Sequence, residues 1–579
     1  MKKLTALFLA ALLCLSAMSN LALAEADEEA VTLTFFHAGA TVIPTNVLDN
    51  PVMNEIAAQT GVKLDWSPYM GGGTASDTAA LAIASNDYPD IWLISDTTII
   101  SKLLEYDLVM PLDDLIANAP HIQEIASNAI DYARFRFNTE ESYLIPAQVG
   151  GVNWYPSGYD MMISYRYDLW KEMGSPTLDS YDAFIDYLIE CKKLEPENKD
   201  GLTNYAAGLP LAAASEWYYV DYHMLNAEGK TTYGPCIYDW KTDELTPRYA
   251  ADSMYFEGAK FWYRLNQLGL LDPESATMTL DQTQSKGQSY RYFFGVANWQ
   301  IGWPNDAVRI VQAEIAQKAD ADLTEWDQRI LKMGWVPLEI NNDSDYVYAR
   351  MGTKFGNGNY YLISKTCKNP EAAMRFIDYM ASYEGAELCG NGPEGYNWHY
   401  VDGVPTWYSK AEREAMEANG VTLYKNDELG ITYVAPLLLV NGNRQNPNGW
   451  PTLYSQATIE QFQAAMSNGE LEFAMDNGYS YGMEYIDANF PHNTFDKAVL
   501  NLIPPIDSTS DLAIIATDTN TLAYEYTIRL IYARDDAEFE QIKQEFLQQL
   551  DVMGYAELVD YYVTNYETVK DTSEQWGFR

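Results

Sequence analysis

Residues Tyr360–Trp398 read YYLISKTCKNPEAAMRFIDYMASYEGAELCGNGPEGYNW. The stretch opens with a short apolar run, Tyr360–Ile363, which is typical of a buried strand. Asn369, Pro370 and Glu371 then form a helix start, because Asn can cap, Pro suits the first helical position and Glu complements the positive end of a helix. Apolar side chains follow at three- and four-residue spacing: Ala373, Phe376, Ile377 and Met380. The sequence therefore predicts a strand followed by a helix with one buried face.

An aromatic loop, GPEGYNW, comes after this helix at residues 392–398. Together with Ser364–Tyr379 it resembles the extracellular solute-binding proteins of carbohydrate ABC transporters, in particular the large lipoprotein-type branch of family 1. That branch carries an I-S-K-x-x-K-N-P-E-A-A-M-x-F-x-D-Y block, then G-x-E-G and a tryptophan. The resemblance implies a protein, not an enzyme and without a cofactor, that captures a carbohydrate and delivers it to a membrane-embedded ABC permease. We expect the carbohydrate to be an oligosaccharide.

The fold implied by the resemblance is α/β and two-lobed, of the periplasmic-binding-protein type. Each lobe would have a mostly parallel sheet flanked by helices, with a hinge of two or three strands between the lobes. The N-terminal lobe would contain residues 31–148 plus about 350–415, and the C-terminal lobe about 149–349 plus 416–579. Closure of the two lobes over the solute would produce the state that the permease recognises.

The order of elements after residue 30 agrees with this fold. Val31–Phe36, Val62–Trp66 and Asp90–Ile94 have the pattern of short apolar strands, and helical segments lie between them. Short strands joined by such helices predict a parallel sheet with right-handed crossovers. In a sheet of this kind the ligand lies beyond the carboxyl ends of the strands, which singles out Trp66 and Asp96.

The chain is strongly acidic. Its 579 residues carry a formal net charge of -45 at pH 7, and 47% of them are hydrophobic. A surface of this sign is a poor partner for nucleic acid and for anionic membranes. The hydrophobic content predicts a folded, soluble core. We expect a monomer that does not bind nucleic acid.

Residues 1–24 have the pattern of a secretory signal peptide. Lys2 and Lys3 form a positive segment, Leu4–Leu15 an apolar core, and Ala-Leu-Ala a small-x-small cleavage site that ends at Ala24. We therefore expect an extracytoplasmic protein, at the cell surface, secreted or periplasmic. Many relatives are lipid-anchored at a cysteine after the apolar core, whereas Cys14 lies inside the core with Leu13, and not a small residue, immediately before it. This argues against a lipid anchor and leaves open how the protein is retained at the cell.

The other cysteines match no zinc-binding spacing. We interpret them as core thiols, and a disulfide between the last two stays open: Cys191, Cys236, Cys367 and Cys389.

The segment Glu195–Tyr205, EPENKDGLTNY, lies where some relatives carry a calcium-binding loop of the D-x-N-x-N-G type. Glu195 replaces the first Asp, and Lys199 falls where an oxygen ligand is needed, so a hard cation would meet a positive charge. We predict no metal site.

Aromatic side chains are the main candidates for the binding site. The chain has 44 tyrosines and 15 tryptophans, which can stack on the apolar face of a pyranose and donate hydrogen bonds from a polar edge. Candidate stacking platforms are Trp66, Trp154, Trp217, Trp299, Trp303 and Trp398. Candidate hydrogen-bonding partners are Asp96, Asn153 and Arg166.

Core packing is the alternative role for each of these tryptophans, and the sequence does not decide between the two. Trp299 and Trp303 lie four residues apart in NWQIGWP, beside Gly and Pro. They could pack in the core or, in a loop that enters a sugar-binding cleft, act as stacking platforms.

Two other functions fit parts of the sequence. A secreted carbohydrate-active hydrolase would share the aromatic content, the acidity and the secretion, and would need two carboxylates about 5 to 9.5 Å apart. The chain has five histidines and no H-E-x-x-H motif. A binding protein of the same fold for a peptide or another small solute is the second alternative, because a fold does not identify its ligand.

Overall fold

The structure is a computed structural model, and it describes most of the chain after residue 29. The described residues are 30–37, 49–66, 75–149, 162–212, 217–338, 340, 348–351, 354–356, 358–421, 463–489, 492–495, 497–507 and 509–576. The site candidates Asn153 and Trp154 and the expected signal peptide lie outside this set. None of the helices in the described part combines the length and the apolar character needed to cross a membrane.

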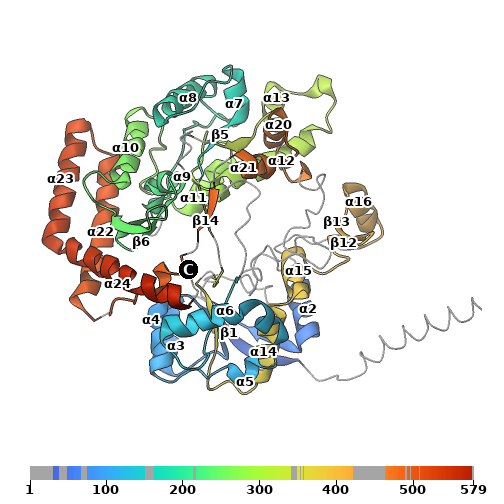
Figure 1. The fold of residues 1–579 in the computed structure, drawn as a ribbon. Helices are drawn as coiled ribbons and strands as arrows, with labels where there is room; N and C mark the ends of the chain where they lie inside the picture. The colour runs from blue at the N-terminus through green and yellow to red at the C-terminus, as the bar shows by residue number, and fades with distance from the viewer. Residues whose placement is uncertain are drawn as a thin grey trace, which may run out of the picture.

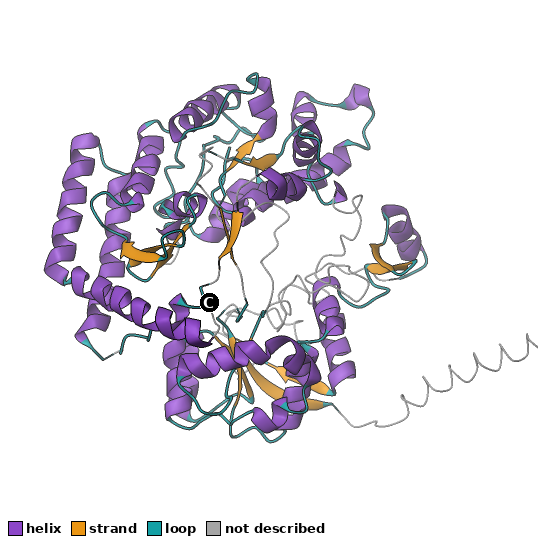
Figure 2. Ribbon diagram, in the orientation of Figure 1, coloured by secondary structure: helices purple, strands orange, loops and turns teal. Residues whose placement is uncertain are grey.

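The elements form two lobes (Figure 1). One lobe contains the N-terminal strands together with helices from the middle of the chain, and the other contains the remaining middle segments and the C-terminal helices. Helices make up most of both lobes, and the strands lie among them (Figure 2). The predicted two-lobed α/β fold is therefore confirmed.

The N-terminal lobe is organised around one five-stranded sheet with the strand order β2-β1-β3-β11-β4. Strands β1, β2 and β3 run parallel, as predicted, whereas β11 is antiparallel to both β3 and β4. The strand bounds are β1 (Val31–His37), β2 (Val62–Asp65), β3 (Ile91–Ile94), β4 (Ile145–Pro146) and β11 (Tyr360–Ile363). The sheet is thus mixed because a segment from the middle of the chain returns into it.

Helices cover both faces of this sheet. Phe35 packs into one apolar cluster with α2, α6 and α14, while the next residue, Phe36, packs into another with α3 and α4, as the alternation of strand side chains requires. The helix bounds are α2 (Pro51–Thr60), α3 (Ala75–Ser85), α4 (Thr97–Glu105), α5 (Asp113–Ile116), α6 (Pro120–Phe137), α14 (Pro370–Tyr379) and α15 (Tyr383–Asn391). Helix α14 begins at Pro370 as predicted, although the side chain of Asn369 makes no capping hydrogen bond.

The strands of the C-terminal lobe pair antiparallel, so the expected mostly parallel sheet is wrong for this lobe within the described residues. Strands β6, β7 and β8 follow one another through short turns, and short turns can join only antiparallel neighbours. Apart from the strands of this lobe, β12 and β13 follow α15 in the chain and form a separate antiparallel pair beside α16. The bounds are β5 (Ser164–Arg166), β6 (Lys230–Tyr233), β7 (Cys236–Asp239), β8 (Glu244–Pro247), β9 (Trp335–Pro337), β12 (Trp398–Val401), β13 (Val404–Trp407) and α16 (Lys410–Ala418).

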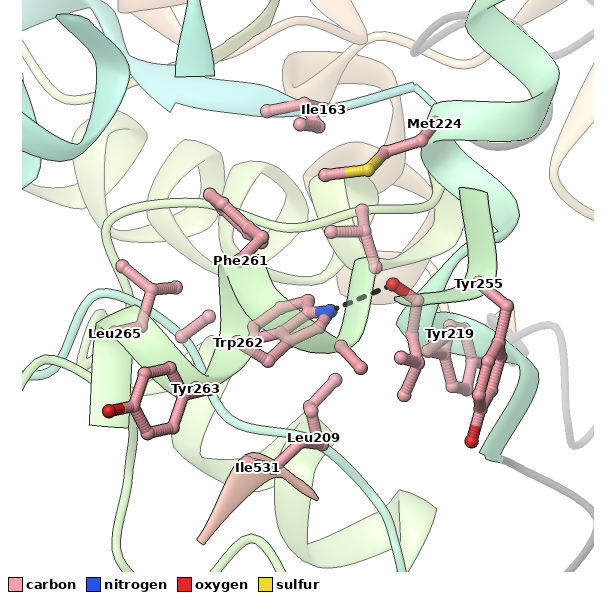
Figure 3. Packing of buried hydrophobic residues seen from close by; sticks show 14 of the residues in the cluster. Ile163, Leu209, Tyr219, Met224, Tyr255, Phe261, Trp262, Tyr263, Leu265 and Ile531 are labelled. Carbon is pink, nitrogen blue, oxygen red and sulfur yellow. Dashed lines mark hydrogen bonds between the residues drawn. The ribbon is translucent and has the colours of Figure 1, made fainter. Parts of the chain in front are cut away.

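A large aromatic core holds the helices of the C-terminal lobe together (Figure 3). Trp262 is fully buried at its centre, and its Nε1 donates to the backbone oxygen of Val220 at 3.1 Å. All four cysteines of the described residues are buried and free, as core thiols should be. The helix bounds are α7 (Tyr167–Glu172), α8 (Tyr181–Leu194), η2 (Trp217–Val220), α9 (Tyr222–Ala227), α10 (Met254–Gln267), α11 (Leu280–Gln288), α12 (Asn298–Ile315), η3 (Asp320–Asp322), α13 (Glu325–Ile330), α20 (Asn468–Asp476), α21 (Gly482–Asn489), η5 (Leu500–Leu502), α22 (Asp511–Ile531), α23 (Asp536–Met553) and α24 (Tyr555–Trp576).

Two strands that are distant in sequence pair between the lobes. Strands β10 (Tyr348–Met351) and β14 (His492–Phe495) run parallel, and β14 lies between the two groups of helices in Figure 1. Just after β14, Ala498 packs in the core of the N-terminal lobe and Leu500 in that of the C-terminal lobe. The Tyr132 hydroxyl fixes this connection by donating to the backbone oxygen of Ala498 at 2.6 Å.

Candidate functional site

The carboxyl edge of the N-terminal sheet is the edge from which the chain passes to the other lobe. The chain leaves this sheet after β4 and returns to it at Tyr360, the first residue of β11. Tyr360 pairs with Ile94, the last residue of β3, and with Pro146, the last residue of β4. Because β11 is antiparallel to its neighbours, its start lies at the edge where β1, β3 and β4 end. The expected ligand-binding edge therefore faces the connections between the lobes.

The outgoing and returning segments touch each other at this edge. Ala147 N donates to Asn359 O at 2.9 Å. A Cβ atom at Gly356, whose φ is +94°, would lie 2.8 Å from Ala147 O and equally close to the Pro146 side chain. Only glycine fits this close backbone approach without strain. The connection is thus tightly packed where it leaves the N-terminal lobe.

Trp66 follows β2 at this edge and stacks on His37, the last residue of β1. The two ring centroids are 5.9 Å apart at an interplanar angle of 8°, and Phe35 contacts the indole edge-on at 5.6 Å. Burial lowers the pKa of His37 to about 4, so the imidazole is neutral at pH 7. Trp66 is 2% exposed, and its Nε1–H has no hydrogen-bond partner among the residues that the structure describes. An unsatisfied buried donor is rare, and this one lies at the edge where a ligand is expected.

Asp96 lies at the same edge, directly after β3, with a structural role in the protein. One carboxylate oxygen accepts from Thr98 N at 2.9 Å and Ile99 N at 3.1 Å, which caps α4. The other oxygen accepts from the Ser76 hydroxyl at 2.6 Å. Trp66 and Asp96 thus lie at the same carboxyl edge of the sheet, but the hydrogen bonds of Asp96 connect α3 with α4.

Trp299 and Trp303 lie in the first two turns of α12, so NWQIGWP is helical and the alternative of a loop is wrong. Trp299 is half-buried against the core of the C-terminal lobe, and its Nε1 donates to the Tyr219 hydroxyl at 3.2 Å. Trp303, also half-buried, faces α11, where a Cβ at Gly287 would lie 3.7 Å from its ring. Trp217 begins η2, the short helix that contains Tyr219, so the Trp217 segment and Trp299 come together.

Arg166 is not placed to contact a solute, which corrects its assignment as a ligand partner. The side chain is 0% exposed and lies over the Trp335 ring at 4.9 Å. Its guanidinium donates to Asp168 and to Glu195. Burial alone would lower the pKa of Arg166, but these two carboxylates outweigh it and hold the pKa well above the usual value. The residue is part of an internal charge cluster.

Trp398 also packs inside the protein, and its assignment as a stacking platform stays a prediction. It is 2% exposed, and its Nε1 donates to Gly392 O at 2.9 Å. The contact closes the GPEGYNW loop on itself, and Tyr400 lies edge-on against the indole at 5.2 Å. A tryptophan after two glycines is thus explained by loop packing.

Sequence reasoning missed two residues of these clusters, His37 and Tyr219. His37 ends β1 at the carboxyl edge, so the rule that selected Trp66 would also have selected it. Tyr219 lay within the WYY run at residues 217–219, but no sequence signal linked it to Trp299, 80 positions away.

One sequence motif bears on the hydrolase alternative. Residues 478–482 read GYSYG, which has the G-x-S-x-G spacing of a serine nucleophile. That motif requires a sharp turn from a strand into a helix. Here the segment joins two helices, α20 and α21, and the backbone of Ser480 donates to the Glu484 carboxylate at 2.7 Å. The structural context of a nucleophile elbow is therefore missing at Ser480.

A family model described as bacterial extracellular solute-binding protein matches residues 52–389, more than half of the chain. The chain belongs to this family. No curated protein is matched by the sequence. Members of this family bind solutes outside the cytoplasm, so the two lobes described here are those of a solute-binding protein.

Several solved structures share the fold of this solute-binding protein over nearly its whole length. An S. pneumoniae ABC-transporter substrate-binding protein, an EF-hand mutant of FusA in complex with fructo-nystose, has a TM-score of 0.59 at 14% identity and covers 94% of this chain and 100% of its own. The alginate-binding protein AlgQ2 without calcium ion has a TM-score of 0.57 at 15% identity. The match covers 93% of this chain and 98% of AlgQ2. An HMO-binding, ABC-transporter-associated solute-binding protein from Bifidobacterium longum infantis has a TM-score of 0.57 at 13% identity, with 93% and 98% covered. At these identities the similarity shows the fold.

Proposed function

We propose that this solute-binding protein captures a carbohydrate, in particular an oligosaccharide, between its lobes and delivers it unaltered to an ABC permease. The observation that carries the proposal is the fold shared along nearly the whole chain with proteins named for binding alginate, HMO and a fructan. The family assignment supports binding rather than catalysis. The lobes would grip the solute from both sides, and this grip would favour the closed state.

Trp66 supports a carbohydrate ligand at the level of single atoms. Its Nε1–H has no partner among the described residues and lies, buried, at the carboxyl edge of the N-terminal sheet, where a sugar hydroxyl could accept from it once the covering residues move. Trp299 and Tyr219 supply a second aromatic pair in the other lobe, with ring centroids 6.2 Å apart. Flat side chains with a polar edge suit a pyranose, which has an apolar face and a rim of hydroxyls.

The magnitudes are sufficient for binding without catalysis. Covering about 100 Å² of apolar sugar face contributes roughly 2.5 kcal/mol, and each hydrogen bond about 1 kcal/mol net. Two or three stacked rings and several hydrogen bonds, less the cost of association, reach the roughly -8 kcal/mol of micromolar affinity.

The proposal includes where the protein works. We propose cleavage of the signal peptide near Ala24, an extracytoplasmic location without a lipid anchor at Cys14, and a monomeric state. The formal net charge of -45 would keep the chains apart by repulsion.

A ligand screen tests this function. The mature protein is melted in the presence of mono- and oligosaccharides, with peptides as controls, and every compound that raises the melting temperature is measured by titration calorimetry. We expect oligosaccharides to raise the melting temperature by mass action, with no reducing ends released during incubation. Stabilisation by peptides alone would replace the carbohydrate with a peptide ligand, and release of reducing ends would mean that the protein is a hydrolase.

A further inference from the structure

The loop Glu195–Tyr205 is closed by its own backbone in the C-terminal lobe. Asn198 N donates to Leu202 O at 2.8 Å, and Asn204 N donates to Pro196 O at 2.9 Å. Its sequence, EPENKDGLTNY, is rich in oxygen-bearing side chains. Two proteins of similar fold are connected with calcium by their descriptions: AlgQ2 was solved without calcium ion, and the FusA protein is an EF-hand mutant. Whether a divalent ion suits this loop depends on what its oxygen atoms already bind.

The Glu195 carboxylate, at the first ligand position of the calcium-loop pattern, is held by a fixed cation. Arg166 Nη1 and Nη2 donate to its two oxygens at 3.1 and 3.2 Å, and Glu195 is 2% exposed. The same guanidinium donates to Asp168 at 2.7 and 2.8 Å, and Arg329 Nη1 lies 3.6 Å from Glu195 Oε2. The two arginines balance the Asp168 and Glu195 carboxylates, while the exposed Glu325 carboxylate lies 3.9 Å from Arg329 Nε at the surface.

Two more cations bind the backbone at the end of the loop. Lys192 Nζ donates to Asn204 O, and Arg291 Nε donates to Thr203 O at 3.0 Å. Both cations lie over the Tyr205 ring, Lys192 at 4.8 Å and Arg291 at 6.0 Å. Burial and the nearby Arg291 charge lower the pKa of Lys192. Carbonyl oxygens that could serve a metal therefore accept from side-chain cations instead.

Other oxygen atoms of the loop bind within the loop. Asn198 Oδ1 accepts from Asp200 N and Leu202 N, both at 3.0 Å. The Asp200 carboxylate pairs with Lys199 at 2.8 and 2.9 Å. Across the described part of the chain, no group of three or more His, Cys, Asp or Glu side chains is arranged to hold a metal ion. Calcium takes about six to eight oxygen ligands, and these residues do not fit it.

We propose that Arg166, Lys192 and Arg291 are built-in cations that close this loop in place of a divalent ion. The stability of the C-terminal lobe is then independent of calcium. A divalent ion at Glu195 would have to displace the Arg166 guanidinium or add two charges to a neutral, buried cluster. Both changes are unfavourable, because a buried charge must be paired to offset its lost hydration.

The first test compares the melting temperature of the mature protein in excess calcium chloride with that in excess EDTA. We expect the same melting temperature in both solutions. A calcium ion that bound the folded protein alone would raise it by mass action. A rise of several degrees in calcium would overturn the proposal.

The second test removes the cations one at a time in EDTA. Lys192→Met leaves the Asn204 carbonyl without its amine, and we expect a melting temperature several degrees below that of the parent protein. Lys193→Met, the matched control on the same helix, removes only an exposed pair with Glu190 and should change nothing measurable. If the two variants have the same melting temperature, Lys192 does not close the loop and the proposal fails.

Arg166→Met extends this comparison to the buried cluster. It leaves the Asp168 and Glu195 carboxylates near each other without their shared cation, so we expect a larger loss than for Lys192→Met. A melting temperature equal to that of the parent would contradict the role assigned to Arg166. If this variant does not fold, the Lys192 and Lys193 pair still decides the question.

Discussion

Two buried tryptophans at the N-terminal sheet differ in a single hydrogen bond. Trp92 on β3 is 0% exposed, and its Nε1 donates to the Ser364 hydroxyl at 2.8 Å. Trp66 after β2 is 2% exposed, but its Nε1 donates to no atom in the described part of the chain. A buried donor without a partner costs about 1–3 kcal/mol. The unpaired donor of Trp66 thus lies at the edge that faces the connections between the lobes, whereas Trp92, within the sheet, is paired.

This difference gives opposite expectations for the same substitution. Both Trp66→Phe and Trp92→Phe trim a buried ring and lose packing. Trp66→Phe breaks no hydrogen bond among the described residues, so we expect only this packing loss in stability, together with about tenfold weaker oligosaccharide binding, the loss of roughly one good hydrogen bond. Trp92→Phe also leaves the Ser364 hydroxyl unpaired and should lower the stability by about 1–3 kcal/mol more than Trp66→Phe while the affinity stays the same. Chemical denaturation and titration calorimetry measure the two quantities. Unchanged affinity in Trp66→Phe would remove Trp66 from the binding site.

Residue types could be predicted from the sequence, but their partners could not. The carboxyl-end rule needs only local strand patterns, so the sequence was enough to place Trp66 and Asp96 at the carboxyl edge of the sheet. Arg166 was misassigned because its burial depends on Glu195, which lies 29 positions away and gives no sign of the contact. The sequence also did not indicate that the Trp398 indole donates to its own loop at Gly392 O, because a glycine-rich aromatic loop looks the same whether its indole faces a ligand or its own backbone.

At the scale of elements, the sequence was informative where the residues at a helix boundary and the apolar pattern agreed. Asn50 caps α2 through Met53 N at 2.9 Å, and Gly61 ends the helix at φ +69°, so both boundaries follow from residue types. Helix α12 was missed because Gly302 and Pro304 signal a loop. Its buried residues Ile301, Val308 and Ile315, at seven-residue spacing, were the helical signal that should have prevailed.

Helix α20 docks on the segment before β9 through two glycines. A Cβ at Gly469 would lie 2.5 Å from Gly334 N, backbone that cannot move aside. We expect Gly469→Ala to lower the melting temperature clearly, because the helix must separate from the strand. Gly482→Ala, at the start of the next helix, meets only a Met466 methyl at 3.6 Å and should be neutral or slightly stabilising. Equal effects of the two substitutions in thermal denaturation would contradict this docking.

At the scale of the whole molecule, the family resemblance predicted two lobes, which composition alone could not. The lobe boundaries near residues 148, 350 and 415 stay predictions. The sequence did not indicate the role of residues 498–502. They fall in the range expected for the C-terminal lobe, but Ala498 and Leu502 pack in the core of the N-terminal lobe. Their pattern is that of any short apolar run, and only the bond from Tyr132 shows which core they join.

The paired connections determine what closure can look like. The segments at Ala147 and Gly356 are in backbone contact, and β10 pairs with β14 along four residues, so bending should be shared by these segments. A solute that touches both lobes stabilises the closed arrangement only by its differential affinity for that state. We therefore expect small-angle X-ray scattering to show a smaller radius of gyration with a saturating oligosaccharide than without it. A disaccharide too short to reach both lobes should bind more weakly and compact the protein less. If a saturating ligand leaves the scattering curve unchanged, the solute is held by one lobe, and the permease must recognise something other than closure.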